Sequence, residues 1–153
     1  MIHLIFIVFL LISAALFALL EIQIEGKYGW AEKLPTWRIP VNPKLLIQPF
    51  MDPNQPQTGY HTFLWAFLLL ILHFPFFFTK WTPRYEFIVF AFYILITTLE
   101  DFFWFLFNPA FGLKKFKKQY IKWQTYWFAG LPIRYWIYFP IGIIFYLIGT
   151  GVL

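Results

Sequence analysis

The sequence predicts an all-α integral membrane protein, a four-transmembrane-helix bundle with a basic amphipathic interfacial helix. Hydrophobic residues make up 61% of the 153 residues and charged residues 12%, against about 45–50% and 25% in soluble domains. Four apolar runs are each long enough to cross about 30 Å of hydrocarbon as a helix. A soluble fold of this length buries too little volume for so much hydrocarbon. We therefore expect a single membrane domain over residues 1–153. Soluble enzymes and nucleic-acid-binding proteins are poor interpretations despite the net charge of +5.

The predicted spans cover about residues 2–20, 60–79, 86–107 and 135–153. The first run has no basic segment before it and is apolar for longer than the core of a signal peptide, so we interpret it as a span. In the fourth span, Gly142 and Gly149 are seven residues apart, which is typical of a close helix–helix contact. That contact would lie either within the bundle or in a homodimer.

Two segments between the spans have distinct patterns. Residues 35–60 carry six prolines, which forbid a regular helix and predict a Pro-rich cytoplasmic loop that could cap the bundle. Residues 113–128 place apolar and aromatic side chains at helical spacing with lysines between them, which predicts the interfacial helix. Its lysines would either dock on anionic lipid headgroups or simply set the topology.

The distribution of basic residues predicts the orientation. The loops after the first and third spans hold ten of the 12 Lys and Arg residues, and the loop between the second and third spans holds two. The positive-inside rule then puts both long loops in the cytoplasm and both termini outside. We expect an integral protein of a prokaryotic cytoplasmic membrane whose partners are membrane lipids, with no nucleic acid.

Absent residue types remove several kinds of chemistry. The chain has no Cys and one Ser, Ser13, which lies inside an apolar run. Disulfides, thiolate nucleophiles, Cys-bound zinc and iron–sulfur clusters are therefore excluded. Ser13 has no His or Lys within helical reach, so a serine hydrolase is a poor interpretation.

The third span is the informative one, because its polar side chains share one helical face. Tyr93, Thr97, Glu100, Asp101, Trp104 and Asn108 lie at i, i+4, i+7, i+8, i+11 and i+15. An acidic side chain at the membrane centre costs about 2.5–3.5 kcal/mol on insertion scales, so such residues usually face partners or water and serve a function. We therefore expect Glu100 and Asp101 to point into the bundle.

Depth along the helices predicts which residues join these acids. The first span ends close to Glu21 and Glu25, the second begins near His61, and the fourth begins near Arg134. Because these ends share one side of the bundle with the inner end of the third span, all should gather at the same leaflet. Trp65 and Tyr138 lie one turn further into their helices.

Carboxylates and an imidazole in this setting favour a divalent metal ion or a shared proton. We interpret Glu100, Asp101 and His61 as catalytic groups, and Glu21, Glu25, His61, Glu100 and Asp101 as candidate ligands of a metal whose identity is unknown. A second set would bind substrate or its headgroup: Arg134, Trp104, Asn108, Trp65 and Tyr138. The predicted function is a buried site near the cytoplasmic leaflet that acts on or binds a lipid or isoprenoid-like apolar substrate.

Other interpretations stay open at this point. The protein could be a homodimeric cation- or proton-coupled transporter or channel, or an accessory membrane subunit without chemistry. Glu21 and Glu25 could be solvated residues beyond the first span, and Glu100 and Asp101 could form a structural ion pair with Arg134 or another basic residue. We expect His3 and His73, near the opposite end of the bundle, to be structural.

Overall fold

A computed structural model describes residues 1–40, 55–121 and 123–153, and most of the chain is helical. Four helices are long and apolar enough to cross a membrane, as predicted: α1 (Ile2–Glu25), α2 (Gly59–Leu72) extended by the 3₁₀ helix η2 (Phe74–Phe77), α3 (Pro83–Phe107) and α5 (Ile133–Thr150). The shorter elements are α4 (Gly112–Lys115) and two antiparallel ribbons, β1 (Arg38–Ile39) with β2 (Gln57–Thr58) and β3 (Trp127–Phe128) with β4 (Leu131–Pro132).

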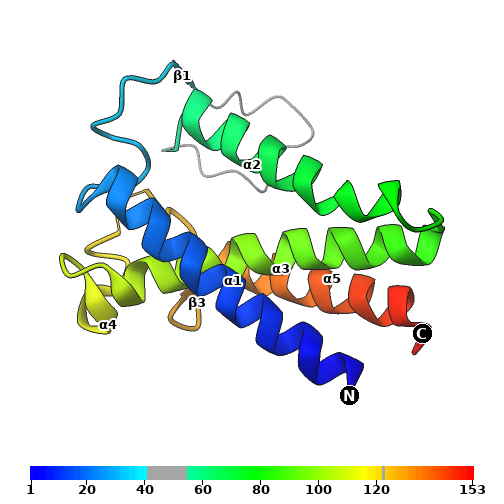
Figure 1. Ribbon diagram of the computed structural model, residues 1–153. Coiled ribbons are helices and arrows are strands. Elements are labelled where there is room, and N and C mark those ends of the chain that lie inside the picture. Colours follow the sequence, from blue (N-terminus) through cyan, green and yellow to red (C-terminus); the bar gives the residue numbers. More distant parts are fainter. Residues whose placement is uncertain (41–54, 122) are drawn as a thin grey trace.

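Helix α3 is the centre of the bundle. In its most apolar stretch 39% of the residues are buried, against 6–17% in the other three spans. It packs mainly against α1 and α5, which cross it on neighbouring faces (Figure 1). One apolar cluster, around Leu10, Phe92 and Leu95, fills the middle of the bundle. A second cluster, around Trp104, Phe105 and Ile121, lies under the loop that follows α3.

Helix α1 continues past the predicted end of the first span. It runs to Glu25 and stops where Gly26 adopts a positive φ of 68°. Ala14 lies two turns before Glu21, and Ala18 lies two turns before Glu25. Both alanines are completely buried, because small side chains let α1 approach α3 closely. The two acids therefore belong to the last turns of the helix and face inward, and they are not solvated residues beyond it.

The glycines of α5 make the predicted close contact within the bundle. A Cβ atom added to Gly142 would lie 2.6 Å from Cγ of Leu95, and one added to Gly149 would lie 2.9 Å from the backbone oxygen of Arg84. Both neighbours belong to α3, so the paired glycines set the α3–α5 distance and need no second copy of the chain.

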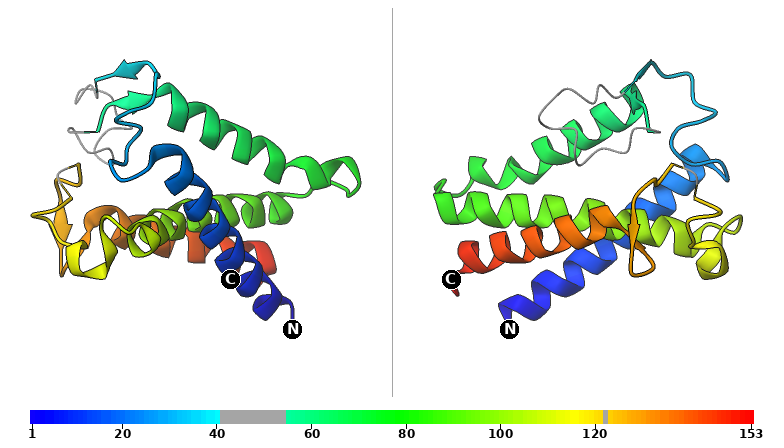
Figure 2. Two further views of the ribbon diagram at one scale, coloured as in Figure 1. Left: turned by 60° about the vertical axis from the view of Figure 1, so that its left-hand side comes forward. Right: turned by 180° about the vertical axis from the view of Figure 1, so that it is seen from behind.

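Polar side chains join the helices at the end that carries both termini. His73 Nε2 lies 2.9 Å from Glu86 Oε1, and Trp81 Nε1 donates to Glu86 Oε2 at 2.7 Å, which closes the turn between α2 and α3. His3 Nδ1 lies 2.7 Å from the Tyr146 hydroxyl and joins α1 to α5. The structure thus gives His3 and His73 the structural contacts expected of them. From this end α2 diverges from α3, as both views in Figure 2 show.

The predicted interfacial helix over residues 113–128 is wrong. Among the described residues of this segment, helix is confined to α4 (Gly112–Lys115), and the chain leaves the helix at Phe116. Ile121 is completely buried, and the ring of Trp123 stacks on Phe105 at 6.0 Å between centroids. The apolar side chains whose spacing predicted a helix instead hold a compact loop against α3. A single isolated helix of this length gains little stability by itself, so tertiary contacts decide the conformation. Lys114, Lys115, Lys117 and Lys118 remain exposed.

The Pro-rich segment is described only at its two ends. Residues 35–40 and 55–58 are extended, and β1 pairs with β2 there, with Arg38 opposite Thr58. This agrees with a non-helical segment, and α2 begins at Gly59 directly after it. Pro43, Pro49 and Pro53 lie outside the described residues.

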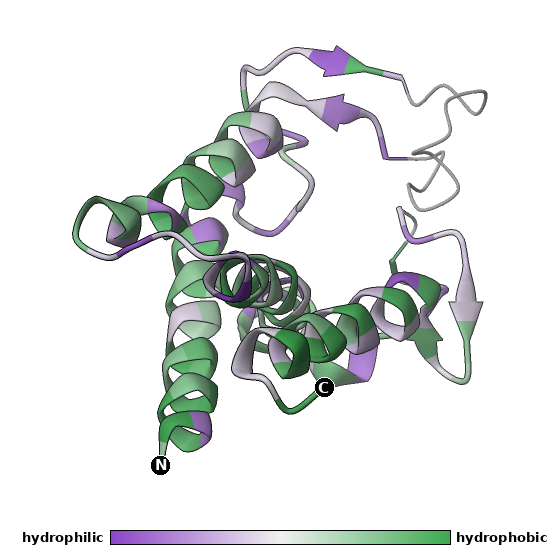
Figure 3. Cartoon of the chain, turned by 90° about the vertical axis from the view of Figure 1, so that its right-hand side faces the viewer, coloured by the Kyte–Doolittle hydropathy of each residue, from purple (hydrophilic) through white to green (hydrophobic). Residues whose placement is uncertain are grey.

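The outward faces of the long helices are apolar over most of their length (Figure 3). Examples are Leu4, Phe9, Phe63, Phe67 and Leu70, each more than half exposed in the isolated chain. Exposed apolar surface on this scale needs an apolar environment or a partner.

The Gly149 contact yields a stability test. Replacing Gly with Ala inside a helix usually stabilises it by about 0.5–1 kcal/mol. We expect Gly149→Ala to destabilise the protein instead, because overpacking against α3 typically costs about 1–3 kcal/mol. Thermal unfolding in detergent should show a melting temperature a few degrees lower for Gly149→Ala. The control Ile144→Ala, on the exposed face of α5, should change the melting temperature little. An unchanged or higher melting temperature for Gly149→Ala would refute the close contact.

Candidate functional site

His61 lies in the first turn of α2 and is 4% exposed. Thr58 caps this helix, because its Oγ1 accepts a hydrogen bond from the His61 backbone N–H at 3.2 Å. The same hydroxyl lies 2.6 Å from His61 Nδ1. One ring nitrogen is therefore occupied by the cap, and the other, Nε2, faces the end of α1.

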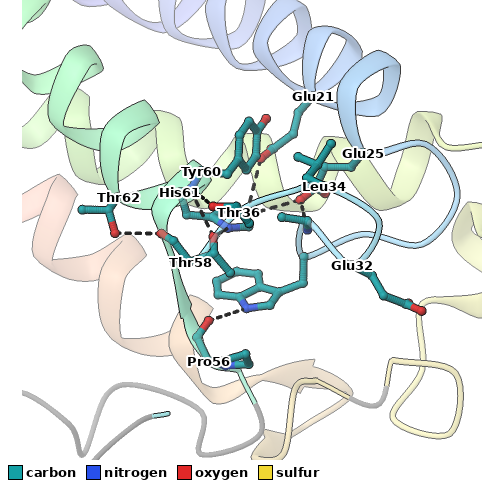
Figure 4. Close-up of polar contacts among 12 residues, drawn as sticks. Glu21, Glu25, Glu32, Leu34, Thr36, Pro56, Thr58, Tyr60, His61 and Thr62 are labelled. Atoms are coloured by element: carbon teal, nitrogen blue, oxygen red, sulfur yellow. Dashed lines mark hydrogen bonds and ion pairs between the residues drawn. The ribbon is translucent and has the colours of Figure 1, made fainter. Parts of the chain in front are cut away.

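Two carboxylates of α1 face Nε2 of His61 (Figure 4). The distance from Nε2 is 3.6 Å to Glu21 Oε1 and 3.4 Å to Glu25 Oε1. Both acids are more than nine-tenths buried. They lie side by side because their i,i+4 spacing puts them on the same face of α1.

The turn after α1 covers this group. Trp30 stacks on the His61 ring at 4.1 Å between centroids, and its indole N–H donates to the Pro56 carbonyl at 2.9 Å. The next backbone N–H, of Ala31, donates to Glu25 Oε1. Trp30 and Ala31 both have positive φ values, 47° and 52°, which few non-glycine residues adopt. Such backbone strain is common at functional sites.

Glu100 of α3 approaches from the opposite side. Its carboxyl group neighbours that of Glu21, and it is 6% exposed. Within the described part of the chain, Oε1 of Glu100 makes no hydrogen bond of normal geometry, and neither does the indole Nε1 of Trp104 one turn later. An unsatisfied acceptor and an unsatisfied donor thus lie on one face of α3, at the same cavity.

Asp101 points toward α5 and away from Glu100. Its Oδ2 accepts a hydrogen bond from the Tyr135 hydroxyl. Arg134, the neighbour of Tyr135, makes no ion pair with Glu100 or Asp101 among the described residues; its guanidinium lies 6.0 Å from the centre of the Tyr138 ring. The structural ion pair considered for these acids is therefore not formed.

A small cavity of about 50 Å³ brings the predicted groups together. All six residues that the depth argument placed at one leaflet line it: Glu21, Glu25, His61, Glu100, Asp101 and Arg134. Trp65 and Trp104 complete part of the wall. A cavity of this size holds a few water molecules, or an ion with water, because one water needs about 10–15 Å³ on this measure.

Two residues predicted to bind substrate lie elsewhere. Asn108 is 2% exposed, and its amide donates to the Gly26 carbonyl at 2.9 Å and accepts from Ala110 N. It joins the ends of α1 and α3 and does not line the cavity. Tyr138 lines a neighbouring cleft together with Arg134 and Trp65.

Sequence reasoning missed two residues of the site, Trp30 and Thr58. Thr58 was detectable, because a threonine directly before a helix and three residues before His61 is a typical N-cap pattern. Trp30 carried no such signal, since its role depends on the positive φ values of the turn around it.

Among the described residues, His61, Glu21 and Glu25 form a group whose ligand atoms lie within 4.8 Å of one another. Ligand atoms bound tetrahedrally at about 2.0–2.2 Å from zinc lie about 3.3–3.6 Å apart, which matches both Nε2–carboxylate distances of 3.6 Å and 3.4 Å. Glu100 and Asp101 are not in this group. The five predicted metal ligands therefore divide into three that converge on one point and two that do not.

No protein-family model, curated protein or solved structure matches this chain. The function must therefore be inferred from the geometry of the site.

The buried acids yield a test of their electrostatics. Without a bound cation, the carboxyls of Glu21, Glu25 and Glu100 share a desolvated space, so removing one should relieve repulsion. We expect Glu100→Gln to raise the melting temperature of the protein measured in excess chelator. The matched change at the exposed Glu32, Glu32→Gln, should leave it unaltered. A lower melting temperature for Glu100→Gln would mean that the acid is needed for structure.

Proposed function

We propose that this chain is an integral membrane metalloenzyme that acts on a lipid-like substrate through a divalent cation held by His61, Glu21 and Glu25. The observation that carries the proposal is the convergence of these three ligand atoms in a buried cavity. Three protein ligands leave one position of a tetrahedral ion open for water or substrate, which is typical of catalytic rather than structural zinc sites.

The surroundings of His61 support metal binding through Nε2. This requires the proton of the imidazole to lie on Nδ1, and Thr58 Oγ1 is 2.6 Å away and able to accept it. A metal-bound histidine usually donates its other ring N–H in this way. The cation would also compensate the burial of the carboxylates, which in isolation is costly.

Glu100 and Trp104 are suited to position a water molecule at the open coordination site. A bound divalent cation makes water acidic enough to supply hydroxide near neutral pH. Glu100 Oε1 would accept the proton of that water, and the Trp104 N–H would donate to an oxygen beside it. Glu100 would then return the proton to the leaving oxygen of an ester or phosphoester, so that one water is consumed and one bond is hydrolysed.

The membrane setting rests on the exposed apolar faces of the four long helices. The exposed lysines after α3 lie at the end of the bundle that carries the site, so we place this end near the cytoplasmic leaflet and both termini outside. A transporter is less well supported, since the packed apolar cluster around Leu10, Phe92 and Leu95 fills the bundle beyond the cavity.

Metal content tests the proposal directly. Mass spectrometry of the detergent-purified protein, incubated with zinc and desalted, should find close to one ion per chain. We expect Glu21→Gln, Glu25→Gln and His61→Asn each to lose it, and the exposed control Glu32→Gln to retain it. Metal that persists in all three variants, or no metal in the unaltered protein, would overturn the assignment.

The contact between Thr58 and His61 makes a finer prediction. Removing the partner of a metal-bound histidine typically weakens metal affinity by about 10–100-fold. We expect Thr58→Val to fall in this range in a competition titration with a chromophoric chelator. Thr58→Ser retains a hydroxyl and the helix cap, so it should bind nearly as the unaltered protein does. Equal affinity of the Val and Ser variants would contradict a role for this contact.

Hydrolysis can be tested before the substrate is known. Vesicles of total bacterial lipid containing the zinc-loaded protein would be incubated in H₂¹⁸O, and the lipid products analysed by mass spectrometry. We expect ¹⁸O in a released acid or phosphate, and none with Glu100→Gln, which should still bind metal. Absence of label with the metal-loaded, unaltered protein would refute the hydrolytic step while leaving metal binding intact.

A further inference from the structure

A second cleft adjoins the metal cavity and is about four times larger. Its volume is about 220 Å³, and it is lined by Trp65 of α2, by Tyr93, Ile94 and Thr97 of α3, and by Arg134 and Tyr138 of α5. Trp65, Thr97 and Arg134 also line the cavity of about 50 Å³ that holds the acids. The two spaces therefore meet along a common wall.

The cleft has more apolar than polar surface, and Arg134 gives it a positive charge where it meets the metal cavity. Tyr93 and Ile94 lie close to the middle of α3, whose bounds are Pro83–Phe107. Arg134 is the second residue of α5 and stands where the cleft meets the metal cavity. Among the described residues its guanidinium forms no ion pair. The cleft thus extends from the middle of α3, which we place in the hydrocarbon region of the membrane, to the positive charge of Arg134 beside the acids.

From these observations we infer that the cleft between α2 and α5 binds the hydrocarbon chain of an anionic membrane phospholipid, with the oxygen-rich end of the lipid at Arg134. This inference rests on the proposed function and names its substrate class. The metal cavity is too small for an alkyl chain, so the apolar part of any substrate must lie outside it. A space open at this depth is reached from the membrane and not from water.

The direction of the lipid follows from the charge. An arginine at a helix end pairs well with a lipid phosphate, because its planar guanidinium donates two parallel hydrogen bonds. The chain would then extend past Thr97 toward Tyr93, about 6 Å further along α3 at about 1.5 Å per residue. This orientation brings the ester bonds of the lipid, and not its methyl end, to the wall shared with the metal cavity.

Another groove provides a matched control. It has a volume of about 420 Å³, lies between α3 and the start of α5, and is lined by residues that include Leu99, Phe102 and Trp136. It shares Thr98 with the cleft but no lining residue with the metal cavity. Ile94 and Leu99 are both half-buried aliphatic residues of α3, one in each space. Enlarging each of them to Trp should fill one space and leave the other open.

Photolabelling in vesicles tests the inference. The protein would be reconstituted in phosphatidylglycerol containing a trace of the same lipid with a diazirine on its acyl chain, and labelled peptides would be quantified by mass spectrometry. A diazirine near the ester should label residues around Arg134 and Tyr138, and one a few carbons further along the chain should label residues around Tyr93. Labelling of the cleft should exceed that of the exposed face of α1 at least fivefold.

The two filled variants decide whether the label reports the cleft. We expect Ile94→Trp to lower cleft labelling at least fivefold and Leu99→Trp to change it less than twofold. Both should keep their zinc, which shows that the variants are folded. Equal labelling of the cleft and the α1 face, or equal effects of the two variants, would overturn the inference.

The photolabelling result for the cleft is independent of metal binding. Chain binding in the cleft needs no metal ligand, so cleft labelling should persist after zinc is removed with chelator. Lost labelling with full zinc occupancy would refute the lipid site alone. Intact labelling in a protein that binds no zinc would refute the metal site alone.

Discussion

The burial of three carboxylic acids against one imidazole is the constraint on which the rest of the structure depends. Glu21, Glu25 and Glu100 are each more than nine-tenths buried and line one cavity with His61. Such groups are tolerated among apolar helices only when partners satisfy them. The surrounding elements supply some of these partners: the α2 cap orients the imidazole, the strained turn after α1 supplies a backbone donor to Glu25, and Arg38 secures that turn by donating to the Ala31 and Thr36 carbonyls.

The bundle separates a packed half from a polar half. At the end that carries the termini, glycines, alanines and large apolar side chains give close contacts between α1, α3 and α5. At the other end, α2 stands away from α3, and the space contains the acids, the cavity and the cleft. Close packing on one side contributes stability that can offset the cost of burying the acids on the other.

Sequence patterns predicted the helices and the meeting of the acids for the same reason: both depend on helical periodicity and on depth. Apolar length identified four spans, and counting residues from their ends brought Glu21, His61, Glu100 and Arg134 to one cavity. The same periodicity failed over residues 113–128, where tertiary contacts of Ile121 and Trp123 replaced a helix. Helical geometry does predict that the neighbours Glu100 and Asp101 point about 100° apart. Periodicity could not show that Asp101 meets Tyr135 of α5, or that Trp30 covers His61.

The order of the three converging residues along the chain has a consequence for biosynthesis. Glu21, Glu25 and His61 all belong to the first 61 residues, so the ribosome has made the whole set before it begins α3. Helix α1 packs mainly against α3, which is synthesised later. Under the proposed function, a cation would join the first two helices before α3 exists, and the supply of metal during membrane insertion becomes part of how the protein folds.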